Sequence, residues 1–185
     1  MKSSFFSVLF VSALLFSGGC MLFQNRYEEP HVYDLGGGLE KAVSLPCKAE
    51  FVSFRNLSGA DRRFLVRVSG NGLVNDEFNR WLVSPELLLE RFLRQSFVSC
   101  GDVPVKIRAV ITGFEIDRRS NTAILSADFT LRSGGRSTTF SSRVQEPFSA
   151  SGSAVSGAAA EAMKRCAAKL AGELEKNILL FLEKK

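Results

Sequence analysis

The sequence predicts an α+β domain, in which a mixed, largely antiparallel sheet of about five strands carries two main helices on one face. Two amphipathic segments, at residues 84–97 and 154–183, predict the helices. Short alternating segments between residues 48 and 146, separated by turns rich in Gly, Ser and Asn, predict the strands. The last three of these strands follow one another through short turns, which is typical of an antiparallel meander.

The first helix is predicted to begin at Ser84, within the run FNRWLVSPELLLERFLRQSF at residues 78–97. Serine is a favoured N-cap because its hydroxyl can accept a hydrogen bond from a free backbone N–H of the first turn. Pro85 suits the first helical position, and Glu86 suits the positive end of the helix dipole. Apolar residues then recur at helical spacing and predict one buried face, consisting of Leu88, Leu89, Phe92 and Leu93 together with Ser96.

The strands are predicted from the alternation of apolar and polar residues. They span residues 48–56, 64–68, 105–117, 123–131 and 137–146. The sequence SGNG at residues 69–72 predicts a hairpin turn, after which Leu73 and Val74 are expected to pair back. Gly113 interrupts the longest strand and predicts a bulge, because glycine in a strand interior often marks one.

The second helix is predicted from the longest periodic segment of the chain, residues 154–183. Its apolar positions follow helical spacing and are expected to pack on the sheet beside the first helix. They are Ala159, Met163, Cys166, Leu170, Leu174, Ile178 and Leu182. The last turns are apolar on nearly every side, so pairing with a partner or with a second copy of the chain is the alternative for this part.

Residues 1–19 have the pattern of a bacterial lipoprotein signal peptide. Lys2 supplies a positive start, and the apolar run at residues 5–16 is too short to span a bilayer comfortably. Three small residues then precede Cys20, which resembles the lipobox at which the leader is cut and the cysteine is acylated. Cys20 is therefore the predicted lipid anchor. Secretion without acylation is the alternative, because Ser17 stands where lipoproteins usually carry an aliphatic residue.

The rest of the chain is predicted to form a tether and one domain. Residues 20–45 lack sustained periodicity and contain Pro30 and three consecutive glycines. They predict a lipidated N-terminus and tether, with a short strand around His31–Leu35. Residues 46–185 are predicted to be a single α+β domain.

The cysteines agree with export, because acylation of Cys20 would leave three, none of them at a spacing typical of a metal site. Cys47 directly precedes a predicted strand, and Cys100 lies between the first helix and the next strand. If these two strands are parallel, both cysteines lie at the same edge of the sheet, so a Cys47–Cys100 disulfide is a hypothesis. Cys166 is interpreted as a small buried core residue.

The sequence favours a non-catalytic protein without a metal or cofactor. It contains no GxSxG, Walker A, HExxH or GxGxxG motif, and its carboxylates are scattered. His31 is the only histidine, and no cysteine or acidic cluster accompanies it in sequence. The formal charge of +5 is mildly basic and is not gathered into a run of Lys or Arg, so nucleic-acid binding is not expected.

The segment before the first helix contains the single tryptophan, Trp81, together with Phe78 and Arg80. In one interpretation Trp81 and Phe78 close the core beside the helix. In the other, the three residues face a partner, because Trp and Arg are enriched at binding hot spots.

Several short motifs resemble the ABC-type transport auxiliary lipoproteins, a family that includes the lipoprotein of the paraquat-inducible operon. The matching features are Tyr33–Leu35 soon after the predicted lipidated cysteine, a strand near Phe51, the aromatic-x-Arg-Trp segment at residues 78–81, the Ser-Pro-Glu helix start at residues 84–86, the strand around Ile111 to Phe114 and the Ala-rich final helix. They cover most of the chain after the leader. Family members usually carry a longer stretch after the tryptophan than the LVSPE of this chain.

This resemblance implies a lipoprotein on the periplasmic face of the outer membrane, where Met21 after the acylated cysteine is compatible with outer-membrane sorting. It would be an auxiliary docking component of an envelope lipid-transport system, with an MCE-domain periplasmic protein and its inner-membrane transporter as partners. The docking surface would include Phe78, Arg80 and Trp81, or the sheet face that the helices leave open. Self-association stays open.

The rival interpretation is a lipoprotein scaffold for outer-membrane assembly or cell-wall contact, unconnected to a transporter. A third is a soluble lipid carrier with a closed apolar cavity.

Overall fold

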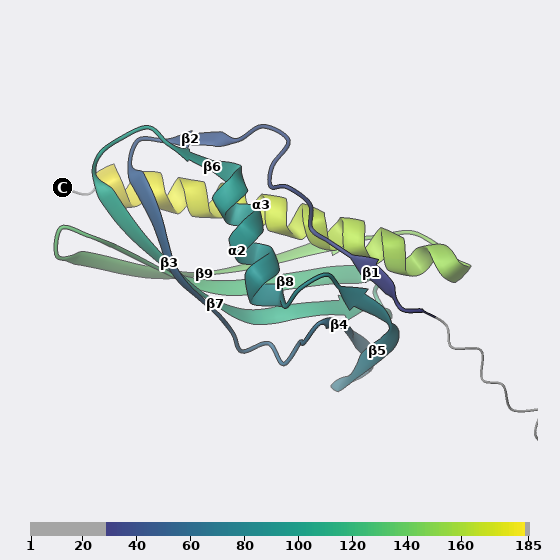
Figure 1. The fold of residues 1–185 in the computed structure, drawn as a ribbon. Helices are drawn as coiled ribbons and strands as arrows, with labels where there is room; N and C mark the ends of the chain where they lie inside the picture. The colour runs from purple at the N-terminus through teal and green to yellow at the C-terminus, as the bar shows by residue number, and fades with distance from the viewer. Residues whose placement is uncertain (1–28, 184–185) are drawn as a thin grey trace, which may run out of the picture.

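A computed structural model describes residues 29–183 of the chain. Within that range nine strands form one seven-stranded and one two-stranded sheet, and two α-helices lie on one face of the larger sheet (Figure 1). The predicted α+β class is confirmed, with more strands than the five or so expected. Three of the strands beyond the main five are only three residues long, namely β1 (His31–Tyr33), β2 (Val43–Leu45) and β6 (Phe97–Ser99). The first matches the short strand predicted around His31–Leu35, whereas three residues are too few for alternation to reveal the other two.

The larger sheet has the order β1-β5-β4-β7-β8-β9, and β3 also pairs with β7. Its longer strands are β3 (Lys48–Asn56), β4 (Arg63–Ser69), β5 (Gly72–Trp81), β7 (Pro104–Asp117), β8 (Thr122–Ser133) and β9 (Arg136–Pro147). The length of β7 lets it pair with two strands in succession. It is parallel to β3 along residues 104–111 and parallel to β4 at residues 116–117.

The predicted antiparallel meander is formed by β7, β8 and β9. Ala109 of β7 lies opposite Phe129 of β8, which in turn lies opposite Phe140 of β9. The register of β7 against β8 shifts between Ile111 and Gly113, as predicted for a bulge. A Cβ at Gly113 would lie 3.1 Å from the Ser126 hydroxyl oxygen, so a side chain at this position would crowd Ser126 on β8.

The first helix, α2 (Pro85–Ser96), begins after Ser84 as predicted. The serine hydroxyl does not cap a backbone N–H as expected, because it donates instead to the Glu86 carboxylate at 2.6 Å. The predicted apolar face of α2 is buried. The second helix, α3 (Val155–Glu183), follows a short 3-10 turn, η1 (Gly152–Ala154), and buries the predicted face as far as Ile178.

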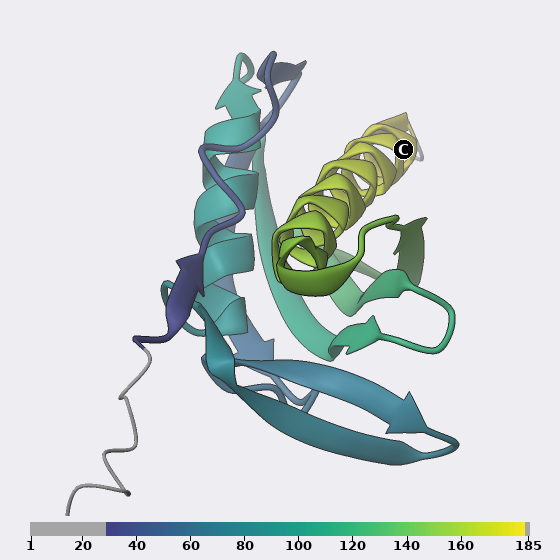
Figure 2. The ribbon, with the colours of Figure 1, turned by 90° about the vertical axis from the view of Figure 1, so that its right-hand side faces the viewer.

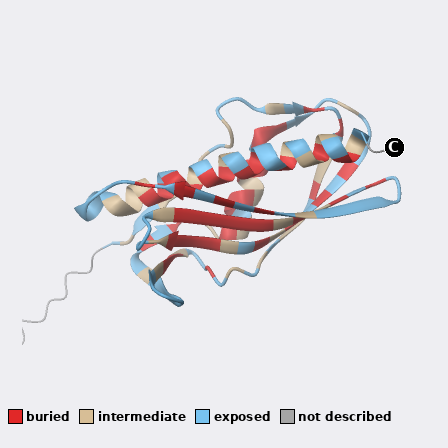
Figure 3. Ribbon diagram, turned by 180° about the vertical axis from the view of Figure 1, so that it is seen from behind, coloured by how far each residue is buried: buried red, intermediate tan, exposed pale blue. Residues whose placement is uncertain are grey.

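The core lies between the sheet and these two helices. The first helix packs mainly on β3, whereas α3 packs on β8 and β9. Figure 2 shows α2 beside α3, with the β4–β5 hairpin projecting away from both. Figure 3 shows that α3 is buried on the side that faces the sheet and exposed on the other side. In the last turns of α3, Phe181 is buried and Leu182 is partly buried.

The chain between β1 and β2 is packed across α2. Leu35 is fully buried, and the backbone N–H of Leu39 donates to the Ser96 hydroxyl at 3.1 Å. Gly38 has φ +82°, and a Cβ there would lie 2.9 Å from the backbone of Gln95, so only glycine allows this approach. Within residues 29–183 the folded region therefore includes β1, β2 and the segment between them, which lie ahead of the predicted boundary at residue 46.

A polar contact joins the edge strand β9 to α3. Glu146 of β9 is buried and accepts a hydrogen bond from the Arg165 guanidinium at 3.2 Å, and it also forms an ion pair with Lys169. Hydrogen bonding from Lys169 and then from Arg165 lowers the pKa of the Glu146 carboxyl, although burial acts in the opposite direction. The charged form of Glu146 is therefore the form that stabilises this contact.

We expect Glu146→Gln to reduce the free energy of unfolding by about 1 kcal/mol at pH 7, because the charge-assisted bonds are lost. A carboxyl whose pKa is lowered in the folded state contributes stability above its ordinary pKa and loses it as the pH falls through the lowered value. The difference from wild type should therefore disappear in acid. Urea unfolding between pH 7 and pH 3 measures it, with Glu161→Gln on the exposed side of α3 as the control. A difference that does not change with pH would contradict this role.

Candidate partner-binding surfaces

The segment Phe78–Trp81 ends β5, and its side chains point in two directions. Asn79 and Trp81 point toward the core, whereas Phe78 and Arg80 point outward. Trp81 is 1% exposed and Phe78 is 56% exposed. This corrects the hypothesis that Trp81 faces a partner, since its ring is covered by its own domain. It also corrects the interpretation that Phe78 closes the core beside the helix, because the Phe78 side chain is exposed.

Trp81 is held in a cluster of aromatic rings from four strands. Its ring stacks on Phe64 of β4 at a centroid distance of 4.4 Å and meets the edge of Phe114 of β7 at 5.1 Å. Tyr33 of β1 lies 5.1 Å from Phe64 on the same cluster. The backbone N–H of Trp81 also donates to the carbonyl of Arg62 at 2.6 Å. The end of β5 is therefore a rigid support for its outward side chains.

We expect Trp81→Ala to reduce the free energy of unfolding by about 3–5 kcal/mol, because it removes a large ring from the centre of this cluster. Phe78→Ala should change stability by less than about 1 kcal/mol, since its ring is largely exposed. Guanidinium unfolding followed by circular dichroism measures both without relying on tryptophan fluorescence. Equal losses in the two variants would show that burial does not distinguish them.

Phe78 lies in a bulge of β5. Arg63 of β4 lies opposite Arg80 of β5. The next residue of β4, Phe64, lies opposite Asp76, so residues 77–79 form an insertion relative to β4. The alternation of the strand is interrupted at this insertion.

Asp76 holds the bulge in place. One oxygen of its carboxylate accepts hydrogen bonds from the backbone N–H groups of Phe78 at 3.0 Å and Asn79 at 3.2 Å. The other oxygen accepts from the Asn79 side-chain amide at 2.9 Å and from Arg118 at 3.2 Å. In the sequence, the only signal of this arrangement is the polar run NDE directly before the phenylalanine.

The outward residues of this region form what we name the β1–β5 surface. It consists of Val32, Phe78, Arg80 and Leu82, all of them exposed. Val32 lies opposite Arg80 in the parallel pairing of β1 with β5. Among residues 29–183, no carboxylate forms an ion pair with Arg80. An exposed aromatic ring therefore lies close to an arginine that is available to bind a partner.

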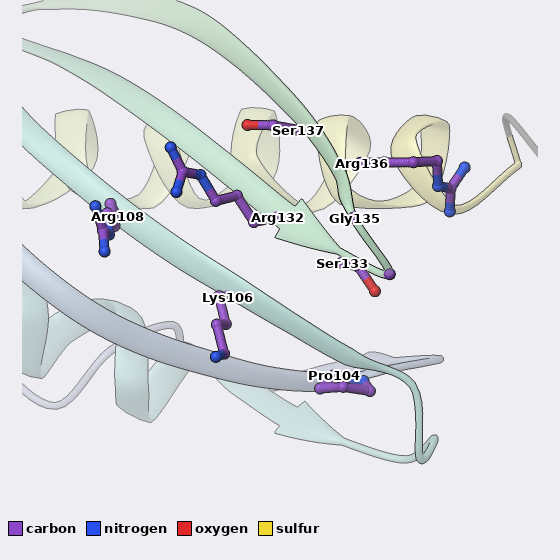
Figure 4. A pocket seen from close by; sticks show the side chains of 9 residues that line it. Pro104, Lys106, Arg108, Arg132, Ser133, Gly135, Arg136 and Ser137 are labelled. Carbon is purple, nitrogen blue, oxygen red and sulfur yellow. The ribbon is translucent and has the colours of Figure 1, made fainter.

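The open face of the sheet is a second candidate surface. At the start of β7 and the end of β8, Lys106, Arg108 and Arg132 are exposed on the face away from the helices. They line a shallow depression of about 560 Å³ beside the β8–β9 turn (Figure 4). From the sequence this face can be predicted only in general terms, because its cations come from two separate strands.

The structure confirms that β3 and β7 are parallel, and it places Cys47 and Cys100 at the same edge of the sheet. The predicted disulfide between them is nevertheless not formed here, where both are free thiols. Cys47 is buried, which raises the pKa of its thiol, whereas Cys100 is exposed. The bond remains a prediction for oxidised protein. Cys166 is buried as predicted, and desolvation raises the pKa of its thiol to about 12.

We expect reduced, folded protein to react with a maleimide at Cys100 first, because only this thiol among the three is exposed. Cys47 and Cys166 should react only after unfolding. Peptide mass spectrometry after timed labelling measures the order. Rapid labelling of all three would contradict the described burial, and a linked Cys47–Cys100 peptide from oxidised protein would confirm the predicted bond.

The remaining predicted residues do not gather into a site. The predicted lipid anchor, Cys20, lies outside the described residues. His31 is exposed on β1. Across residues 29–183, no three His, Cys, Asp or Glu side chains are grouped in a way that could hold a metal ion. The helices in this part of the chain are too short or too polar to cross a membrane.

No protein-family model matches the sequence, and no curated protein matches it. Solved structures share the fold. A crystal structure titled only as an uncharacterized protein is 14% identical and has a TM-score of 0.63, covering 82% of this chain and 99% of that one. Protein XCC0632 from Xanthomonas campestris, of family DUF330, is 14% identical with a TM-score of 0.60, covering 84% of this chain and 94% of its own. At this identity the likeness establishes the α+β fold and nothing finer.

Proposed function

We propose that this protein is a lipid-anchored, non-catalytic docking subunit of an MCE-type envelope lipid-transport system. The observation that carries the proposal is the β1–β5 surface, where exposed Phe78 lies close to Arg80 on a strand end fixed by buried Trp81. Exposed aromatic and arginine side chains on a rigid support are typical of binding hot spots, since little entropy is lost when they bind.

The predicted lipid anchor at Cys20 supports a location at a membrane. Cys20 precedes β1 by eleven residues, so even a fully extended chain would keep β1 within about 40 Å of the acylated cysteine. The β1–β5 surface thus includes the described strand that follows the predicted anchor most closely along the chain. We place the protein on the periplasmic face of the outer membrane, and its partners are an MCE-domain periplasmic protein and the associated inner-membrane transporter.

The test is co-purification from cells that express the tagged chain from its native locus, after crosslinking and extraction in detergent. We expect recovery of an MCE-domain protein. Replacing both Phe78 and Arg80 by alanine should reduce recovery about tenfold or more, because each residue has hot-spot character. Leu87→Ala is the matched control, because this leucine is exposed to a similar extent but lies on α2.

Two outcomes would overturn the proposal. Recovery of only assembly-machinery or cell-wall proteins would favour the scaffold interpretation. Full recovery of the MCE-domain protein by the Phe78 and Arg80 double variant would place docking elsewhere on the domain. The double variant is preferable to Trp81→Ala, since loss of the buried ring would alter the fold itself.

A further inference from the structure

The open face of the sheet gathers positive charge that the sequence distributes over separate strands. Lys106 of β7 lies directly opposite Arg132 of β8. Arg108, two residues further along β7, projects from the same face and lies opposite Thr130. We name Lys106, Arg108 and Arg132 the basic sheet face. All three are exposed, and none forms an ion pair with a carboxylate within residues 29–183.

Among the described residues, the carboxylates near this face form no ion pair with its cations. Glu50 of β3 lies beside Lys106 in the register, but it already forms an ion pair with Lys48 at 3.4 Å. Asp128 lies further along β8, opposite Val110. Like charges directly opposite one another on neighbouring strands are destabilising. The pairing of Lys106 with Arg132 therefore has an energetic cost that binding of an anion would remove.

The surroundings of the basic sheet face suit an anionic oxygen group. The depression of about 560 Å³ that it lines is bounded by Pro104 and by the β8–β9 turn. Gly134 and Gly135 form that turn with φ of +54° and +80°, and a Cβ at either would have open space around it. Hydroxyl groups flank the cations, because Ser137 lies opposite Arg132. Arg136 is not part of this group, since its guanidinium lies 5.1 Å from the Phe181 ring.

We propose that the basic sheet face binds the phosphate headgroups of anionic phospholipids at a membrane surface. A docking site for a protein partner would be expected to contain exposed aromatic or large apolar side chains. Here the face presents cations and hydroxyl groups, which matches a layer of headgroups. Juxtamembrane Lys and Arg side chains are attracted to anionic lipid, and the attraction falls off within about a Debye length.

The basic sheet face also lies at the end of the domain away from β1 (Figure 1). Figure 1 shows the β8–β9 turn at one end of the domain and β1 at the other. Along β7, nine residues separate Arg108 from Asp117, where β4 pairs, which corresponds to about 30 Å of strand. Headgroups can therefore occupy this face without covering the β1–β5 surface.

The test uses the chain from residue 20 onward with Cys20→Ser, so that no acyl chain contributes; this chain contains every described residue. Co-sedimentation is measured with vesicles of phosphatidylcholine alone and of phosphatidylcholine with one quarter phosphatidylglycerol. We expect binding only to the second composition, with loss of binding as salt is raised. Replacing Lys106, Arg108 and Arg132 together by glutamine should weaken binding about 10- to 100-fold.

A control variant carries the same change in net charge elsewhere, through Lys41→Gln, Arg119→Gln and Lys176→Gln, all at exposed positions. It should bind nearly as well as wild type. Thermal unfolding should show the Lys106, Arg108 and Arg132 variant to be at least as stable as wild type, because repulsion is relieved. The vesicles contain no protein partner, so this result does not depend on the proposed docking function.

Three outcomes would overturn the inference. Equal binding to both vesicle types would exclude headgroup charge as the cause. Equal loss in the two triple variants would assign the effect to net charge rather than to this face. Tighter binding of a short DNA duplex than of the anionic vesicles would assign the face to nucleic acid.

Discussion

The packing of Trp81 is the interaction on which the arrangement of the sheet depends. The hairpin of β4 and β5 is attached to β7 through only two paired residues of β4, Val66 and Arg67. Two paired residues are a weak attachment for a projecting hairpin. The stack of Trp81 on Phe64 and its edge contact with Phe114 join the same two parts through buried aromatic area. Without that contact, β1 would also lose the strand on which it pairs.

The same contact explains why the outward face of β5 can be a binding surface. A strand buried on one side presents its alternate residues in fixed positions on the other side. Phe78 lies in the bulge held by Asp76 and is exposed on the side of β5 opposite to Trp81. At the opposite end of the sheet the second candidate surface arises from strand pairing. The regular pairing of β7 with β8 brings Lys106 and Arg132 together on the open face. Both candidate surfaces are thus consequences of strand register.

Much of the fold could be predicted from periodicity. The apolar faces of α2 and α3, the meander and the bulge at Gly113 are all local patterns, and each is confirmed. The parallel pairing of β3 with β7 could be assumed from the sequence but not predicted, because no local pattern indicates strand direction. Of the three-residue strands, β1 matches the predicted short strand, whereas β2 and β6 have no signal in the sequence, since three residues are too few for alternation.

The sequence by itself therefore determined the class of fold, the helices with their buried faces and the leader-like pattern that ends at Cys20, because each depends on neighbouring residues. Only the tertiary structure decided that Trp81 is covered by its own domain while Phe78 is exposed, since the rings that cover Trp81 come from the distant strands β4 and β7. It also decided that Cys47 is buried while Cys100 is exposed, and that cations from two strands share one face. Periodicity indicates which residues of a strand share a side. Register and packing between distant segments determine what that side meets.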